Sequence, residues 1–181
     1  MSPSVYIQLF LCSLLCSGAI SAENATCTNP RAQSNVDMNQ VYSDWFVGQV
    51  NMPANATLPK TRCFTVSVKK MNESTLEVSM KIHEEIRRHV FSIGNAENAG
   101  TWQDINEDRT VQVIYLSADG TTMALACCVE NRVEPLCILM SKQLPISSGK
   151  KEEVLQAVEN AGITGSHCQF TWISEATCPS V

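Results

Sequence analysis

The stretch "TTMALACCVENRVEPLCILMSKQ", Thr121 to Gln143, contains two apolar runs separated by the polar segment Glu130-Asn131-Arg132. Each run has the length and composition of a β-strand, and turn residues between two such runs are typical of antiparallel neighbours. Two adjacent cysteines, Cys127 and Cys128, lie in the first run, and Cys137 lies in the second. Because successive strand residues point to opposite faces of a sheet, Cys127 and Cys128 are expected to serve different sides of the fold.

The two faces of the first run differ in composition. Cys127 shares its face with Met123 and Leu125, which are bulky and suit the interior of the fold. The face of Cys128 carries small side chains that suit a surface covered by another segment: Thr122, Ala124 and Ala126. Cys127 is therefore either a buried thiol, acting as a small apolar side chain, or the cross-strand disulfide partner of Cys137.

The first residues of the chain are typical of a secretory signal peptide. They hold an apolar run and no charged side chain before Glu23. Small residues follow the run and predict cleavage after Ser21 or Ala22, and the run is too short to span a membrane. We expect residues 1–22 to be a signal peptide and residues 23–181 to form one domain, since about 160 residues suffice for a sizeable core.

Cysteines and glycosylation motifs agree with a secreted, extracellular protein. Nine cysteines minus Cys12 and Cys16 of the signal peptide leave seven, which in an oxidising compartment are expected to be mostly in disulfides. Seven is odd, so at least one lies outside the intrachain disulfides. Three N-x-S/T motifs predict glycosylation at Asn24, Asn55 and Asn72.

Charge and motifs exclude several classes of function. The formal net charge is −5, without clusters of Lys and Arg, so we expect neither nucleic-acid binding nor attachment to anionic membranes. No later apolar run is long enough for membrane insertion. The cysteine spacings do not fit a zinc site, so no metal is expected. No G-x-S-x-G, H-E-x-x-H or phosphate-binding glycine loop occurs, so we expect no cofactor and no enzymatic activity.

Between Asp44 and Gln143 the sequence reads as a series of strands. In "TLEVSMKIH", residues 75–83, apolar and polar side chains alternate strictly, which is the pattern of a half-buried antiparallel strand. Strands are predicted at 45–51, 63–70, 75–83, 87–93, near 101–102, and at 110–116, 122–129 and 135–142. Asp119-Gly120 predicts a tight hairpin turn. About eight strands are the number whose closed barrel can hold one small ligand.

The period of the pattern changes after the last strand. The segment from Lys150 to Ala161 predicts an amphipathic helix whose apolar stripe consists of Val154, Val158 and Ala161. Ser147 or Ser148 can cap its start, and Gly162 follows as a stop signal. We expect the stripe to pack on the outer wall of the barrel.

The order of strands and helix, with "SDWFVG" opening the first strand, resembles the lipocalin family from Cys27 to Cys178. Lipocalins place a tryptophan early in strand one and a basic residue late in strand eight, and Trp45 and Lys142 match these positions. The resemblance implies a mostly β fold: an eight-stranded antiparallel up-and-down β-barrel with one C-terminal α-helix packed outside. It also implies that Lys142 covers the Trp45 ring at the closed end of the barrel.

Three further segments, "CTNPRAQ", "RCF" and "HCQF", are similar to salivary lipocalins of blood-feeding arthropods. This similarity implies a disulfide between Cys63 and Cys168, and one between Cys27 and either Cys127 or Cys128. Since Cys128 is expected on the outer face of its strand, it is the better partner for Cys27.

The resemblance further implies a ligand cavity inside the barrel. The candidate apolar and aromatic residues of the ligand site are Val78, Met80, Ile82, Phe91, Tyr115, Met123 and Leu125. Arg87 and His89 share a face with Phe91, so they either point inward, toward a ligand carboxylate, or form a basic patch near the rim. His89 is also the only counterpart of the haem-binding histidine of a few arthropod lipocalins. The alternative is a core whose side chains fill the barrel.

Two classes of function remain. The first is a secreted protein that carries or sequesters a small hydrophobic or amphipathic ligand of the eicosanoid, fatty acid or amine type. The second is an interaction protein or inhibitor that uses the barrel as a scaffold against a host or partner protein. The size of the cavity separates them, because an open pocket favours a carrier and a filled core favours a scaffold.

Overall fold

The computed structural model describes residues 27, 29–51, 63–82, 85–107, 109–128, 135–163, 170–172 and 178. The expected signal peptide and the glycosylation motifs at Asn24 and Asn55 lie outside these residues, and so does Cys168. Asn72 lies in an exposed turn between two strands. Ile82 is the last residue of a strand, but its side chain lies outside the described part.

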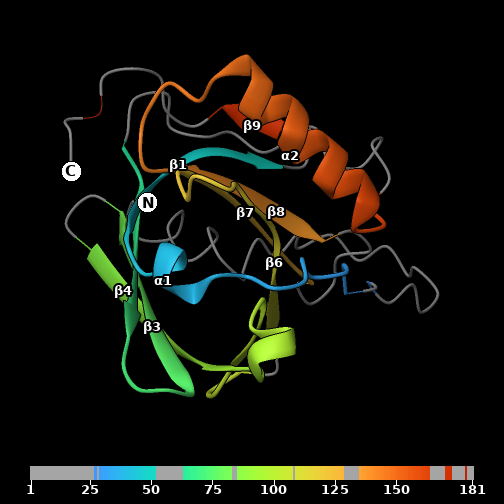
Figure 1. Ribbon diagram of the computed structural model, residues 1–181. Coiled ribbons are helices and arrows are strands. Elements are labelled where there is room, and N and C mark those ends of the chain that lie inside the picture. Colours follow the sequence, from blue (N-terminus) through green and yellow to red (C-terminus); the bar gives the residue numbers. More distant parts are fainter. Residues whose placement is uncertain are drawn as a thin grey trace, which may run out of the picture.

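Eight consecutive strands form a closed antiparallel barrel (Figure 1). Each strand pairs with the next one along the chain, and β1 pairs with both β8 and β2, which closes the ring. The strands are β1 (Asp44–Asn51), β2 (Thr65–Lys70), β3 (Thr75–Ile82), β4 (Glu85–Ile93), β5 (Thr101–Asp104), β6 (Thr110–Leu116), β7 (Thr122–Cys127) and β8 (Leu136–Ser141). A 3-10 helix, η2 (Ala96–Asn98), connects β4 to β5. The predicted up-and-down barrel is therefore confirmed.

A short ninth strand, β9 (Phe170–Trp172), adds to the edge of β1. The edge is available because β1 pairs with β2 only from Asp44 to Phe46, whereas β9 pairs with Gln49 to Asn51. The sequence did not predict β9, since three residues are too few to display a period of two.

Alternation along the strands creates two apolar layers, one on each side of the barrel wall. The inner layer fills the barrel and includes Trp45, Val66, Val68, Leu76, Phe91, Trp102, Val113, Met123 and Met140. The outer layer lies on β6, β7 and β8 and includes Ile114, Ala124, Ala126, Cys137 and Leu139. The outer face of these three strands therefore needs a cover.

Helix α2 (Ser148–Asn160) supplies that cover, and Figure 1 shows it lying along the outside of the barrel. Ser147 caps its start by accepting a hydrogen bond from the backbone N–H of Lys150. Val154 and Val158 are each 1% exposed and pack into the outer layer together with Ala161. Gly162 follows with a φ of 85°, a left-handed conformation that glycine adopts without strain. The predicted helix, its cap and its packing are confirmed.

A single helical turn, α1 (Met38–Val41), closes one end of the barrel beside the start of β1. The indole N–H of Trp45 donates to the backbone oxygen of Val41 at 3.0 Å, and the Lys142 ammonium donates to the backbone oxygen of Gln40 at 3.0 Å. A Cβ atom added to Gly120 would meet the Gln40 side chain at 2.9 Å, so the predicted Asp119-Gly120 turn packs closely against α1.

Two disulfides tie the ends of the chain to the barrel. The predicted bond between Cys27 and Cys128 is confirmed. The predicted bond between Cys63 and Cys168 is wrong, because Cys63 is bonded to Cys178. Since β9 runs antiparallel to β1, its last residue, Trp172, lies nearest the part of β1 that pairs with β2, and Cys178 follows β9 in the chain whereas Cys168 precedes it.

The register between β7 and β8 separates the other two described cysteines. Ala126 lies opposite Cys137, and Cys127 lies opposite Leu136. Cys127 therefore belongs to the inner layer and Cys137 to the outer layer, and both are buried thiols. Of the two alternatives for Cys127, the buried thiol is confirmed, since a cross-strand disulfide to Cys137 would need both sulfurs on one face.

Candidate functional site

The inner layer leaves a cavity toward the end of the barrel opposite α1, where β5 ends and β6 begins. Its wall is mostly apolar and includes Val78, Met80, Phe91, Trp102, Val111, Leu125, Cys127, Leu136 and Ile138. Two polar side chains, His89 and Arg109, complete the wall. Mostly apolar walls with a few polar groups are typical of sites for small molecules.

The cavity is small. About 470 Å³ of empty space, which includes the mouth that is open to solvent, contains about 40 Å³ that the centres of water molecules can occupy. The smaller volume is the one to compare with the space that a water molecule needs. Since one water needs ~10 to 15 Å³ by that measure, the cavity has room for a few waters or for one compact group of a larger molecule.

Several residues predicted for a ligand site do line this cavity: Val78, Met80, His89, Phe91 and Leu125. Of the two alternatives for His89, a side chain that points inward and one in a basic patch near the rim, the structure has the inward one. Arg87 is half-buried and lies opposite Met80, but it is not among the residues that line the cavity. Met123 is fully buried in the inner layer, near the closed end.

The placement of Tyr115 inside the barrel is wrong. The pairing of β6 with β7 shifts by one residue between Val113 and Tyr115. Because of this bulge, Ile114 and Tyr115 both pack in the outer layer, while Val113 and Leu116 both face inward. The Tyr115 hydroxyl donates to the Glu153 carboxylate on α2, and burial of the ring together with this bond raises the pKa of Tyr115.

Sequence reasoning missed several residues at the site, among them Trp102, Asp104 and Arg109. The sequence places Trp102 in a short strand without giving a direction for its side chain. It is completely buried, and its indole N–H donates to the backbone oxygen of Ala99 at 3.0 Å. Asp104 and Arg109 flank a turn whose polar residues look like ordinary solvent-exposed loop, so their burial left no signal in the sequence.

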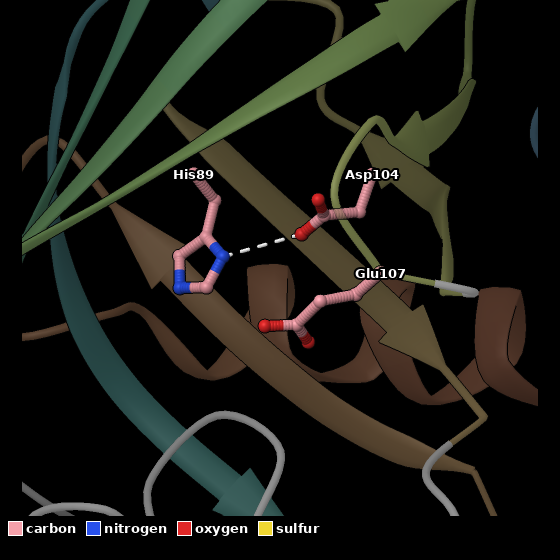
Figure 2. Close-up of side chains that lie close together, drawn as sticks. All are labelled: His89, Asp104 and Glu107. Carbon is pink, nitrogen blue, oxygen red and sulfur yellow. Dashed lines mark hydrogen bonds and ion pairs between the residues drawn. The ribbon is translucent and has the colours of Figure 1, made fainter.

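A cluster of charged side chains lies beside the cavity, and Figure 2 shows three of its members. The Nδ1 atom of His89 lies 3.2 Å from an Asp104 carboxylate oxygen. The Asp104 side chain is fully buried, whereas those of His89 and Glu107 are 22% and 51% exposed. The Arg109 guanidinium, which is 8% exposed, forms an ion pair with Glu107. The cluster therefore runs from the interior to the surface.

The turn from β5 to β6 positions this cluster. Phe91 lies opposite Asp104 in the sheet, so His89 on the next inward position of β4 is within reach of the Asp104 carboxylate. The backbone N–H of Asp104 donates to the oxygen of Arg109 at 2.9 Å, and the N–H of Arg109 donates to the oxygen of Glu107 at 2.8 Å. These bonds hold the backbone of Arg109 beside Asp104 and Glu107, and Figure 2 shows both carboxylates on the side of His89.

Comparison with known proteins agrees with this architecture. No family model and no curated protein matches the sequence. Solved structures do match. The chain is similar to the siderocalin Ex-FABP, with a TM-score of 0.57 and 17% identity over 77% of this chain and 97% of that one. It is also similar to lobster apocrustacyanin A1, with a TM-score of 0.58 and 6% identity over 84% and 91% of the two chains.

A cockroach allergen, Per a 4, matches with a TM-score of 0.59 and 12% identity over 86% of this chain and 98% of that one. The protein forms a closed eight-stranded antiparallel barrel, with a cavity inside and one helix packed outside. This architecture is the lipocalin fold, as the resemblance read from the sequence implied.

Proposed function

We propose that the protein is a secreted binding protein that holds a small hydrophobic or amphipathic molecule in the cavity of its barrel. The observation that carries the proposal is the cavity itself: its wall is apolar, with His89 and Arg109 at one end. A molecule with an apolar body and one polar end would place the body against Val78, Met80 and Phe91. Its polar end would meet the charged residues at the mouth.

The size of the cavity restricts the ligand. Candidate classes are eicosanoids, fatty acids and amines, the ligand types considered for a carrier of this kind. Because the cavity takes only a few waters, a long chain would enter by one end and leave its remainder at the mouth. Compact members of these classes are favoured. The siderocalin Ex-FABP functions through dual ligand specificities, which supports a binding role for this fold without naming a ligand here.

Secretion and glycosylation belong to the same proposal. Two disulfides are typical of proteins that fold in an oxidising compartment, which agrees with a signal peptide at residues 1–22. Among the described residues, no helix is long and apolar enough to cross a membrane. Asn72 is exposed, so an enzyme that attaches glycans could reach it, and Asn24 and Asn55 are proposed on their sequence motifs alone. We assign binding rather than catalysis.

The proposal is tested by closing the cavity. Val78 lies on its wall, and Ser79, the next residue of β3, is on the outer face, where its hydroxyl donates to Glu77. We expect Val78→Trp to weaken binding of a fluorescent fatty acid by at least about tenfold, equivalent to ~1.4 kcal/mol. The matched control Ser79→Trp should bind as the parent does.

Extra volume in a packed interior costs ~1 to 3 kcal/mol of stability, so thermal melting must accompany the assay. Val78→Phe is the milder variant if Val78→Trp does not fold. Native mass spectrometry of protein purified from a eukaryotic secretion host would identify the ligand that co-purifies. Equal binding by the Val78 and Ser79 variants would overturn the cavity as the site and favour a protein partner on the outer surface.

A further inference from the structure

We propose that His89, Asp104 and Glu107 form a binding site for a divalent cation of the zinc type at the mouth of the cavity. These three side chains come from β4, from the end of β5 and from the turn that follows it. The inference goes beyond the proposed function, because the cation needs no ligand in the cavity in order to bind.

The distances between the three groups suit a single cation. One potential ligand atom from each residue lies within 4.8 Å of the other two. The His89 nitrogen and the Asp104 oxygen are 3.2 Å apart. In a tetrahedral site with bonds of about 2.0 to 2.1 Å, neighbouring ligand atoms are separated by about 3.3 Å. The histidine and the aspartate therefore already have the required separation.

Asp104 is held in place before any cation arrives. One of its oxygens accepts a hydrogen bond from the backbone N–H of Asn106 at 2.9 Å, which leaves the other directed at His89. A buried carboxylate needs a positive or donating partner, and the Nδ1–H tautomer of His89 would supply it. A cation bound at Nδ1 would take the position of that proton, and the neutral imidazole would then carry its one proton on Nε2.

Glu107 would complete the site from the solvent side. Glu107 lies in the turn after β5, and its side chain is 51% exposed. A small rotation of this side chain can therefore bring its carboxylate to a cation between the other two groups. One imidazole nitrogen and two carboxylate oxygens resemble the three-ligand zinc sites that keep a fourth position open. Because His89 also lines the cavity, a polar group of a bound molecule could occupy that position.

The positive charge of Arg109 would weaken binding of a cation, and this gives the proposal a further test. It forms an ion pair with Glu107 and is nearly buried. With neutral His89, the charges of Asp104, Glu107 and Arg109 sum to −1, and a divalent cation would change the sum to +1. We therefore expect Arg109→Gln to bind the cation more tightly than the parent does, because the competing guanidinium is removed.

The experiment uses the mature chain without an affinity tag, stripped of metal by a chelator. Calorimetry with Zn²⁺ and absorption spectroscopy with Co²⁺ should each detect one cation per chain. His89→Gln and Glu107→Gln should each weaken binding by at least about tenfold. The matched controls are Glu97→Gln, an exposed acid on η2, and substitution of the other two histidines, His83→Gln and His167→Gln; all three should bind as the parent does.

Failure of this inference is distinguishable from failure of the proposed function, because fatty-acid binding is measured separately on the metal-free protein. The inference is overturned if the parent binds no cation. It is also overturned if Glu107→Gln and His89→Gln bind normally while His83→Gln or His167→Gln does not, which would place the cation elsewhere. Glu107 is on the surface, so Glu107→Gln is expected to fold and keeps the test decisive if His89→Gln does not.

Discussion

Lys142 covers the indole of Trp45, with its ammonium nitrogen 4.7 Å from the centre of the ring. The same ammonium donates to the backbone of Gln40, and the indole N–H donates to the backbone of Val41. Both bonds end on α1, so the pair attaches this helical turn to the closed end of the barrel. Burial of the ammonium lowers the pKa of Lys142. The predicted geometry of this pair is confirmed.

We expect Lys142→Glu to destabilise the fold. The change removes the cation from the ring and the hydrogen bond to Gln40, and it places a carboxylate near a backbone oxygen. The combined loss is expected to be ~2 to 4 kcal/mol, measured by urea denaturation. Lys142→Arg, which keeps the charge and can still donate to Gln40, should be neutral or stabilising. Equal stability of the two variants would show that the pair does not hold α1.

Val158→Asp is expected to destabilise the protein because it places an unpaired charge between α2 and the barrel. The cost should be ~2 to 4 kcal/mol. The matched control is Leu155→Asp on the same helix, where the parent side chain is 48% exposed, and it should cost less than about 0.5 kcal/mol. If both variants melt at one temperature, α2 is not docked through its Val154 and Val158 stripe.

Asp119 should make the stability of the protein depend on pH. It accepts hydrogen bonds from the hydroxyls of Ser117 and Thr121 and from the backbone N–H of Thr121, and these bonds lower its pKa in the folded state. A depressed folded pKa gives stability that is present above the unfolded pKa, 3.8, and is lost as the pH falls through the folded value.

Asp119→Asn should therefore melt below the parent at about pH 7, and the difference in melting temperature should shrink toward about pH 2. Glu152→Gln, an exposed change on α2, is the control and should show no such trend. A difference that stays constant over this range would show that the hydrogen bonds do not depend on the charge of Asp119.

The bond between Cys63 and Cys178 closes a loop with a sequence separation of 115. We expect Cys178→Ser to lose ~4 to 5 kcal/mol in the chain-entropy account, and secretion should fall accordingly. Peptide mapping without reduction should recover Cys63 joined to Cys178. Cys168→Ser is the control and should leave this linked peptide unchanged. A peptide joining Cys63 to Cys168 would contradict the structure.

Strands with strict alternation could be predicted from the sequence, because the pattern records directly which side chains meet the core. In β3, the alternation places Val78 and Met80 on one face, and the expectation that the bulkier apolar face points inward is confirmed. The cap at Ser147 and the stripe of α2 were readable for the same reason, since each depends only on neighbouring residues. The barrel followed from the number and order of such elements.

Features that depend on distant contacts could not be predicted in this way. A single bulge in β6 reversed the direction of Tyr115, and no residue type announces it. The partner of Cys63 depended on where a three-residue strand adds to β1. The contact between His89 and Asp104 joins residues with a sequence separation of 15, and it depends on the register of β4 against β5, which the sequence between them does not specify.

In the register of β7 against β8, Cys127 lies one residue beyond the partner of Cys137, so the two cysteines are on opposite faces of the barrel wall. They therefore offer two chemical probes with different locations. Both are thiols with the same intrinsic chemistry, yet one borders the cavity and the other lies beneath α2. A thiol reagent small enough to enter the barrel would label Cys127 while α2 shields Cys137, so the order of labelling would report separately on occupancy of the cavity and on undocking of the helix.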